Sequence, residues 1–299
     1  MTGPERGFLL LSSHLGNPHR KPLTHAQMRT LGQRMQNAPR PEEDRDLTPA
    51  DLTALGYGAE LAEQIVALLS EEELLDHYLR RAAKCGCVPI TRVSPAYPSV
   101  LKEKLGFEAP GCLWAKGDLE ILKNKRISLV GSRDLYPKNA EFAREAGRQA
   151  ALQGFCLVSG NARGADRTAQ EAALTAGGSV ISIVADALSE HLPRKGVLYL
   201  SEDAFDEAFS PQRALSRNRC IHALGEKVLV AQCSYQQGGT WDGSVKNLRF
   251  SWSPLFCFRD GSPASQLLRQ MGAELVTLED LQDLKALQNS EDNFLAGSR

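Results

Sequence analysis

The second half of the chain alternates between short apolar runs and longer amphipathic segments. Six runs rich in Val, Ile, Leu or Phe occur at 127–130, 155–158, 180–184, 197–200, 228–231 and 255–258. Such runs, without polar alternation, are typical of strands buried on both faces of a sheet. Apolar periodicity between the runs predicts helices at 140–153, 166–176, 214–224, 244–251 and 262–271. Repeated strand–helix units favour an α/β fold with a mostly parallel sheet and right-handed crossovers.

The first third of the chain has a helical pattern instead. Helices are predicted at 26–35, from 48, from 59 and over 71–84. Thr48 followed by Pro49 is a good helix start, because Thr is a favoured N-cap and Pro is tolerated in the first turn. The polar segment 36–46 has no periodicity and is predicted to be a linker.

These changes of pattern divide the chain into four parts. They are an N-terminal segment and linker (1–47), a small helical module (48–95), an α/β domain (96–287) and a disordered tail (288–299). The apolar run at 8–11 is shorter than a secretory or membrane segment requires. We expect this run to pack as a small helix or strand.

Charge and cysteine usage narrow the classes of function. The 299 residues include 35 basic and 36 acidic side chains, for a net charge of −1, which excludes a strongly basic polyanion binder. Any phosphate site must therefore come from local placement of Arg and Lys. Seven scattered cysteines are typical of reduced thiols in a cytoplasmic protein, and Cys85 and Cys87 are too closely spaced for paired zinc ligands. We expect a cytoplasmic protein without a metal site.

Polar residues suited to phosphate binding follow the first predicted strand. Gly131 permits a tight turn, Ser132 and the amides after it are hydrogen-bond donors, and Arg133 can bind a phosphate bidentately. The alternative is an ordinary turn with a surface arginine.

The second predicted strand leads into a glycine-rich segment, Ser159 to Asp166. Gly160 and Gly164 frame a turn into a helix, and the free amides of a helix N-terminus form an anion site. We expect both glycines to hold backbone conformations or close approaches that a Cβ would disturb. A side chain at position 164 is expected to fill the space of a phosphate and so to weaken binding more than stability. Asp166 is predicted to cap the helix or to contact the ligand.

An arginine cluster precedes the fifth predicted strand. Arg213, Arg217 and Arg219 lie close together around Asn218 and form a local positive patch in a nearly neutral chain. A solvated charged face is the alternative. His222 follows on the same predicted helix and is expected to be a packed or partly exposed side chain rather than a base.

A second glycine-rich segment follows the fifth predicted strand. Gly238, Gly239 and Thr240 are predicted to form a phosphate-cradling loop before a helix. Trp241 either stacks on a base or closes the core. Since the carboxyl ends of parallel strands lie at one edge of a sheet, these segments are expected to converge on one site.

These motifs, in this order, resemble those of the DNA-processing protein A (DprA/Smf) family. The resemblance covers about residues 85–280. Residues 238–241 resemble a branch of the family with a Gly-Gly-Thr-Trp loop. The other matching residues are Tyr97 and Pro98 before the sheet, Gly131 to Arg133, the loop residues Ser159, Gly160, Ala162, Gly164 and Asp166, the Arg-Asn-Arg run Arg217 to Arg219, and Gly272 with Ala273.

The resemblance implies a Rossmann-like core that binds single-stranded DNA. Members of the family protect strands in natural transformation, load a RecA-type recombinase, are usually homodimers and are not known as enzymes. We therefore expect no catalytic residue and no cofactor. The expected DNA- or phosphate-binding residues are Gly131, Ser132, Arg133, Ser159, Gly160, Ala162, Arg163, Gly164, Asp166, Arg217, Asn218, Arg219, Gly238, Gly239 and Thr240.

Two other functions are compatible with this pattern. One is a sensor that binds a small nucleotide without turnover. The other is an enzyme similar to the phosphoribohydrolases, which carry Pro-Gly-Gly-x-Gly-Thr-x-x-Glu. Aligning Gly238 and Gly239 with that motif places Val245 at the catalytic Glu, so the carboxylate that this chemistry needs is missing there.

Overall fold

The computed structural model describes residues 1–37 and 46–288. The chain divides into two compact units, Met1–Tyr97 and Pro98–Arg299, which are described separately below. The predicted linker at 36–46 and the predicted tail at 288–299 lie almost entirely outside the described residues.

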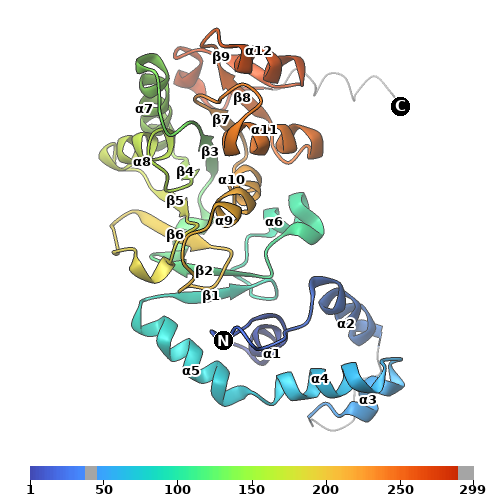
Figure 1. Cartoon of the computed structure of the whole chain (residues 1–299). Helices are drawn as coiled ribbons and strands as arrows, with labels where there is room; N and C mark the ends of the chain where they lie inside the picture. The colour runs from blue at the N-terminus through green and yellow to red at the C-terminus, as the bar shows by residue number, and fades with distance from the viewer. Residues whose placement is uncertain (38–45, 289–299) are drawn as a thin grey trace. The chain divides into compact units, whose positions relative to one another are not determined.

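The first unit is built from helices and ends with one short strand (Figure 1). Thr48 caps a helix as predicted, because its side chain accepts a hydrogen bond from the amide of Asp51. Leu52, Ala62 and Ile65 pack with apolar residues of the preceding helices into one core. The elements are α1 (Gly3–Ser12), α2 (His25–Asn37), α3 (Pro49–Ala54), α4 (Ala59–Leu69), α5 (Glu72–Lys84) and β1 (Val88–Thr91).

The second unit contains a sheet whose strands lie in the order β2-β6-β5-β4-β3-β7-β8-β9. All neighbouring pairs are parallel except β2 and β6, which are antiparallel. The strands are β2 (Cys112–Lys116), β3 (Arg126–Val130), β4 (Cys156–Ser159), β5 (Val180–Ile183), β6 (Val197–Ser201), β7 (Val228–Val230), β8 (Leu255–Phe258) and β9 (Glu274–Val276). The α/β prediction with a mostly parallel sheet is confirmed.

The six predicted strands correspond to β3 to β8. Sequence analysis did not predict β1, β2 and β9. Both β1 and β9 have few residues and are only partly buried, so neither produces a continuous apolar run. The sequence of β2, Cys-Leu-Trp-Ala-Lys, ends on a charged residue.

Helices cover both faces of the sheet (Figure 1). On one face, Ile127 and Leu129 of β3 join a core with α7 (Pro137–Leu152) and α8 (Ala165–Thr175). On the other face, Ser128 donates a hydrogen bond of 2.5 Å to the carbonyl of Ile221 in α10. The remaining helices of the unit are α6 (Ser99–Leu105), α9 (Pro211–Ser216), α10 (Asn218–Leu224), α11 (Gly238–Phe250), α12 (Pro263–Gln270), and the 3-10 helices η1 (Gly106–Glu108), η2 (Leu119–Lys123), η3 (Leu188–Glu190) and η4 (Asp280–Asp283).

Two predicted helices differ from the structure. The helix predicted over 214–224 is two helices, α9 and α10, which meet at Arg217. The helix predicted over 244–251 begins earlier, at Gly238.

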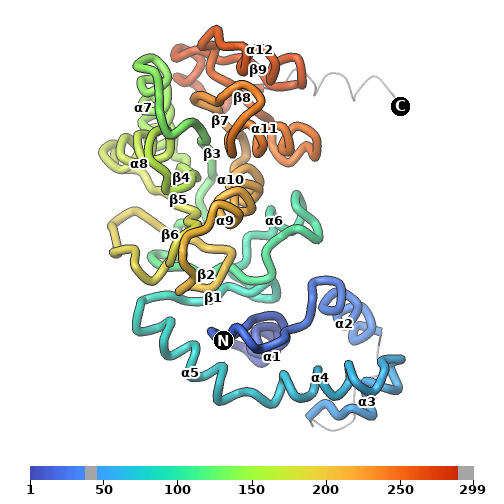
Figure 2. The backbone as a smooth tube through the Cα atoms, viewed as in Figure 1, coloured from blue at the N-terminus to red at the C-terminus, as the bar shows by residue number. Residues whose placement is uncertain are grey.

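The chain changes direction across the sheet at β3. From β3 it proceeds through α7 and β4 toward β5 and β6, and it then returns to place β7 on the other side of β3 (Figure 2). In open parallel sheets the crevice at such a switch point, beyond the carboxyl ends of the strands, is where ligands bind. The segments after β3 and β7 therefore define the first place to look for a site.

Candidate functional site

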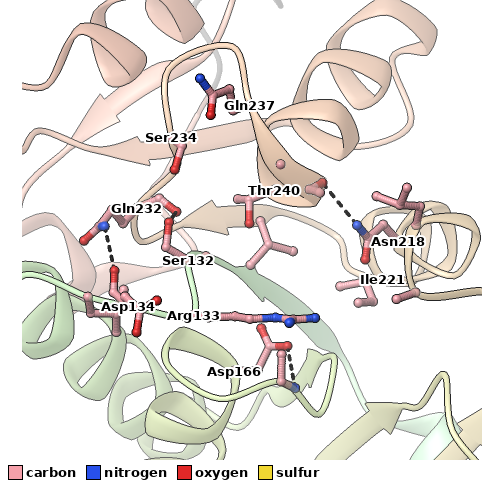
Figure 3. Close-up of a pocket in the computed structure, with 18 of the residues that line it drawn as sticks. Ser132, Arg133, Asp134, Asp166, Asn218, Ile221, Gln232, Ser234, Gln237 and Thr240 are labelled. Atoms are coloured by element: carbon pink, nitrogen blue, oxygen red, sulfur yellow. Dashed lines mark hydrogen bonds between the residues drawn. The ribbon is translucent and has the colours of Figure 1, made fainter. Parts of the chain in front are cut away.

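A pocket of about 780 Å³ lies at this switch point (Figure 3). It is bounded by the segments that follow β3 and β7, the start of α8, the helices α9 and α10, and the first turn of α11. Its lining residues are 130–136, Ala162, Asp166, Phe209, Pro211, Ala214, Leu215, Arg217, Asn218, Ile221, His222, Gln232, Ser234 and 237–240. The convergence of the predicted segments is therefore observed.

Arg133 is the exposed cation of this pocket. Its side chain extends into the pocket close to Asp166 (Figure 3). Its guanidinium makes no hydrogen bond or ion pair with any other residue that the structure describes. A guanidinium without a protein partner presents all its donors to a ligand, and its planar geometry suits a phosphate.

The N-terminus of α11 faces the same pocket. Gly238, Gly239 and Thr240 line the pocket, but they form the first turn of a helix and not the loop that we expected. The N-cap residue Gln237 makes no side-chain capping bond to this turn. Amides at the start of a helix have no partner within the helix, and the helix dipole favours an anion there. The prediction of a loop was wrong, whereas donors at these positions do face the pocket.

Asp166 lies at the inner wall of the pocket, in the first turn of α8. The N-cap of α8 is Gly164, so the prediction that Asp166 caps the helix was wrong. Its carboxylate instead accepts a hydrogen bond of 3.2 Å from the amide of Ala162. Burial raises the pKa of Asp166, and the neighbouring charge of Arg217 acts in the opposite direction.

Arg217 is a buried cation, unlike Arg133. Only 8% of the residue is exposed, and one of its terminal nitrogens donates to the carbonyl of Ile183 at 2.7 Å. Burial lowers the pKa of Arg217, whereas the charges of Asp166 and Asp186 raise it. The guanidinium thus compensates the charge of the buried Asp166, and only part of the side chain borders the pocket.

Gly160 and Gly164 both make close approaches that a Cβ would disturb, as expected. A Cβ at Gly160 would collide with the guanidinium of Arg217, and a Cβ at Gly164 would collide with the carbonyls of Ser132 and Arg133. Gly164 also has a φ of +86°, which side-chain-bearing residues rarely adopt. A side chain at 164 therefore collides with backbone, so the structure favours a loss of stability rather than a selective loss of binding.

Five of the expected binding residues do not line the pocket: Ser159, Gly160, Arg163, Gly164 and Arg219. Arg163 forms an exposed ion pair with Asp134 at 2.7 Å. Arg219 pairs with Glu202 at 2.7 Å and donates to the carbonyl of Glu108. These contacts account for both arginines within the folded chain, and their part in binding stays a prediction.

Several pocket residues were not predicted from the sequence. Tyr136 and Phe209 are exposed aromatic residues that line the pocket, 68% and 54% accessible. Gln232 lies two residues after the end of β7, so the rule that ligands bind after parallel strands pointed to it. Nothing in the local sequence marks Phe209, because it is brought in by the long segment between β6 and α9.

His222 is packed inside the unit, whereas Trp241 is partly exposed. His222 is 1% exposed, as the packing prediction requires, and neither ring nitrogen has a partner among the described residues. Burial lowers the pKa of His222 to about 4, so it is neutral at pH 7. Trp241 lies outside the pocket lining and is near Tyr235, with ring centroids 6.1 Å apart.

The described residues contain no cluster of three or more His, Cys, Asp or Glu side chains able to hold a metal ion. All seven cysteines are free thiols. Burial raises the pKa of Cys156 to about 11 and that of Cys233 to about 12. Across 1–37 and 46–288, no helix has the length and apolar character needed to cross a bilayer.

Comparisons with known proteins agree on one family. The model of the family described as DNA recombination-mediator protein A matches residues 89–280. The chain is 28% identical over 162 residues to DNA processing protein DprA of Bacillus subtilis, and 30% identical over 198 residues to that of Streptococcus pneumoniae. These matches cover 50% and 60% of this chain, and 53% and 68% of those proteins. The chain thus spans about half the length of the first of these relatives and two thirds of the second.

Two solved structures share the fold. The X-ray structure of DprA from Streptococcus pneumoniae has a TM-score of 0.69 and 23% identity, and the likeness covers 96% of this chain and 99% of that one. A structure of DNA processing protein A from Helicobacter pylori, described as giving insight into its single-stranded DNA binding mode, has a TM-score of 0.54 and 23% identity. It covers 66% of this chain and 92% of that one.

Proposed function

Because the chain belongs to the DNA recombination-mediator protein A family, we propose that it binds single-stranded DNA through the switch-point pocket. Through this binding, the protein would act in DNA processing and recombination. The function rests on a site for the DNA backbone and involves no chemical turnover.

One observation carries this proposal. The unpaired guanidinium of Arg133 and the uncapped first turn of α11 border the same pocket. Each is a donor group suited to phosphate oxygens, and neither makes a hydrogen bond to another part of the described fold. Phosphate contacts position a nucleic acid without reading its sequence.

The pocket also offers a place for bases. Tyr136 and Phe209 expose much of their rings at the pocket. Stacking of bases on aromatic rings is a common component of single-strand binding, because every base has a π-face. Bases in a duplex are already stacked on one another, so these rings favour single-stranded over double-stranded DNA.

The proposal extends to partners and setting. The resemblance of the whole motif set to the DprA/Smf family, including the branch with a Gly-Gly-Thr-Trp sequence, supports loading of a RecA-type recombinase by a homodimer. It also supports a role in natural transformation in the cytoplasm. The net charge of −1 indicates that the DNA-binding surface is local.

The test is single-stranded DNA binding by an Arg133→Ala variant across a salt series. We expect affinity to fall about tenfold or more, because a hydrogen-bonded charge contact contributes about 1.5–3 kcal/mol. The slope of log K against log salt should become shallower by about 0.7, the value for one phosphate contact on a single strand. Fluorescence anisotropy with a labelled oligothymidylate measures both.

Arg269→Ala is the matched control, because Arg269 is an exposed arginine of α12 outside the pocket lining. It removes the same charge from the chain and should leave affinity and slope unchanged. Wild-type affinity and slope in a folded Arg133→Ala variant would refute the proposal.

The same assay distinguishes the nucleotide-sensor alternative. A pocket of about 780 Å³ is within the size range of small-molecule sites. Mononucleotides and oligothymidylate are compared at equal concentrations of phosphate groups. If mononucleotides then displace the labelled strand as well as unlabelled oligothymidylate does, the ligand is the nucleotide and not the strand. We expect mononucleotides to compete weakly, since one phosphate and one base use only part of the pocket.

A further inference from the structure

The segment that carries Arg133 is held in place from across the switch point by one residue, Gln232. We propose that Gln232 is a positioning residue, which fixes this segment so that Arg133 is directed into the pocket before a ligand arrives. This inference rests on the proposed function of the pocket.

Four hydrogen bonds join Gln232 to the segment after β3. Its main-chain carbonyl accepts from the amide of Ser132 at 2.9 Å and from the Ser132 hydroxyl at 3.3 Å. Its side-chain oxygen accepts from the amide of Tyr136 at 2.9 Å, and its side-chain nitrogen donates to the carbonyl of Asp134 at 2.9 Å. The last of these is drawn in Figure 3. The contacts fall on both sides of Arg133.

The segment has few other hydrogen bonds, although Leu135 packs against the core and Gly164 lies against the carbonyls of Ser132 and Arg133. The carbonyl of Ser132 accepts from the amide of Ala165 at 3.1 Å, which anchors its first part to α8. Tyr136, the N-cap of α7, makes no side-chain capping bond. The side chain of Asp134 forms an ion pair with Arg163, but both side chains are largely exposed, and such pairs contribute little. The hydrogen bonds on both sides of Arg133 therefore come mainly from Gln232.

A glutamine suits this position because its amide combines an acceptor and two donors without a charge. The Tyr136 amide needs an acceptor, whereas the Asp134 carbonyl needs a donor. A glutamate would offer only acceptors and would add a negative charge to a phosphate pocket. Prior ordering of the segment reduces the entropy lost when a strand binds.

The first experiment compares Gln232→Met with the wild type in binding to oligothymidylate across a salt series. Met has a similar length and no strong hydrogen-bonding group. We expect affinity to fall about five- to tenfold, which is the effect of ordering one or two side chains at a binding site. The salt slope should become shallower, toward that of Arg133→Ala, because a misplaced guanidinium no longer contacts its phosphate.

The double variant Gln232→Met/Arg133→Ala separates positioning from direct contact. If Gln232 acts through Arg133, the double variant binds no more weakly than Arg133→Ala alone, since coupled residues are not additive. If the two losses multiply, Gln232 contacts the strand by itself and the positioning role is wrong.

Gln153→Met is the matched control. Gln153 also joins two backbone groups through its side chain, donating to the carbonyl of Leu281 at 2.9 Å and accepting from the amide of Leu284 at 2.7 Å. It lies at the end of α7 and outside the pocket lining. The control variant loses the same kind of hydrogen bonds. Its melting temperature should therefore fall, whereas its affinity for oligothymidylate and the salt slope should stay unchanged.

Amide hydrogen exchange tests the inference without DNA. In Gln232→Met the amide of Tyr136, which loses its side-chain acceptor, should exchange faster than in the wild type and in Gln153→Met. The amide of Ser132 keeps its bond to the main-chain carbonyl of residue 232. Unchanged exchange at Tyr136 overturns the positioning role whatever the binding data show. If the wild type fails to bind oligothymidylate while exchange changes as expected, only the proposed function fails. If Gln232→Met does not fold, Gln232→Asn replaces it in the same measurements. Asn keeps the amide, but its side chain is too short to reach both the Tyr136 amide and the Asp134 carbonyl.

Discussion

Arg133 and Arg217 have the same charge but different access to a ligand. Arg133 is exposed in the pocket and has no ion-pair partner among the described residues, whereas Arg217 is buried and bonded to the carbonyl of Ile183. At the scale of single residues, burial therefore decides which arginine can exchange water for phosphate. The same reasoning applies to His222, which burial keeps neutral.

His222 should make stability depend on pH. Its pKa is about 4 in the folded chain and about 6.5 in an unfolded one, so between these values the unfolded state binds more protons. The contribution of His222 to the free energy of unfolding is therefore largest above pH 6.5. It falls by about 3 kcal/mol as the pH decreases to 4.

The variant His222→Leu should lose this contribution. Urea unfolding at pH 7 and pH 5 measures it: the loss of stability between the two should be smaller in the variant than in the wild type. At pH 7 the variant should be no less stable, because it removes two buried nitrogens without partners. Equal pH dependence in both proteins would show that His222 titrates normally.

At the scale of elements, the starts of the helices decide the shape of the pocket. The break between α9 and α10 lies at Arg217, whose side chain then reaches Ile183 in β5. The start of α8 lies against the carbonyls of Ser132 and Arg133 through Gly164. These junctions connect the pocket segments to one another, so changes there affect folding first.

Gly164→Ala should lower the free energy of unfolding by about 3 kcal/mol or more, from an unfavourable φ together with a backbone collision. Gly177→Ala is the control, because Gly177 has a φ of +80° with nothing near its would-be Cβ. That control should lose only about 1 kcal/mol. Chemical denaturation of both variants measures the difference, and equal losses would mean that the segments do not pack closely.

At the scale of the whole molecule, the balance of charge and the choice of residues favour binding over turnover. The net charge is −1, so under the proposed function the attraction for DNA comes from the pocket and not from a basic surface. The pocket lining contains two carboxylates, Asp134 and Asp166. The first pairs with Arg163 and the second accepts from the Ala162 amide, and Val245 replaces the Glu of the phosphoribohydrolase motif.

We therefore predict no release of base from nucleoside monophosphates. The protein is incubated for a prolonged time with purine and pyrimidine nucleoside monophosphates, and the products are separated by chromatography. The amount of free base should not exceed that in a sample without protein. Free base produced at an enzymatic rate, and lost in the Arg133→Ala variant, would overturn this prediction and identify the pocket as an active site.

The sequence by itself determined the α/β class, six strands of the sheet and the edge at which the pocket lies. Buried parallel strands leave continuous apolar runs, and glycine and arginine residues follow them, so these features are local. The three other strands were not predicted, because they are short, partly exposed or polar at one end.

Only the tertiary structure decided how the candidate residues are used. Gln232 bonds to Ser132, 100 positions away, and Gly164 lies against the carbonyl of Arg133. No local pattern records such contacts, because they depend on which strands become neighbours. For the same reason the sequence could not distinguish Arg133 from Arg217 or Arg219. The direction of each side chain is set by the packing of distant segments, and that packing leaves Arg133 alone of the three exposed in the pocket.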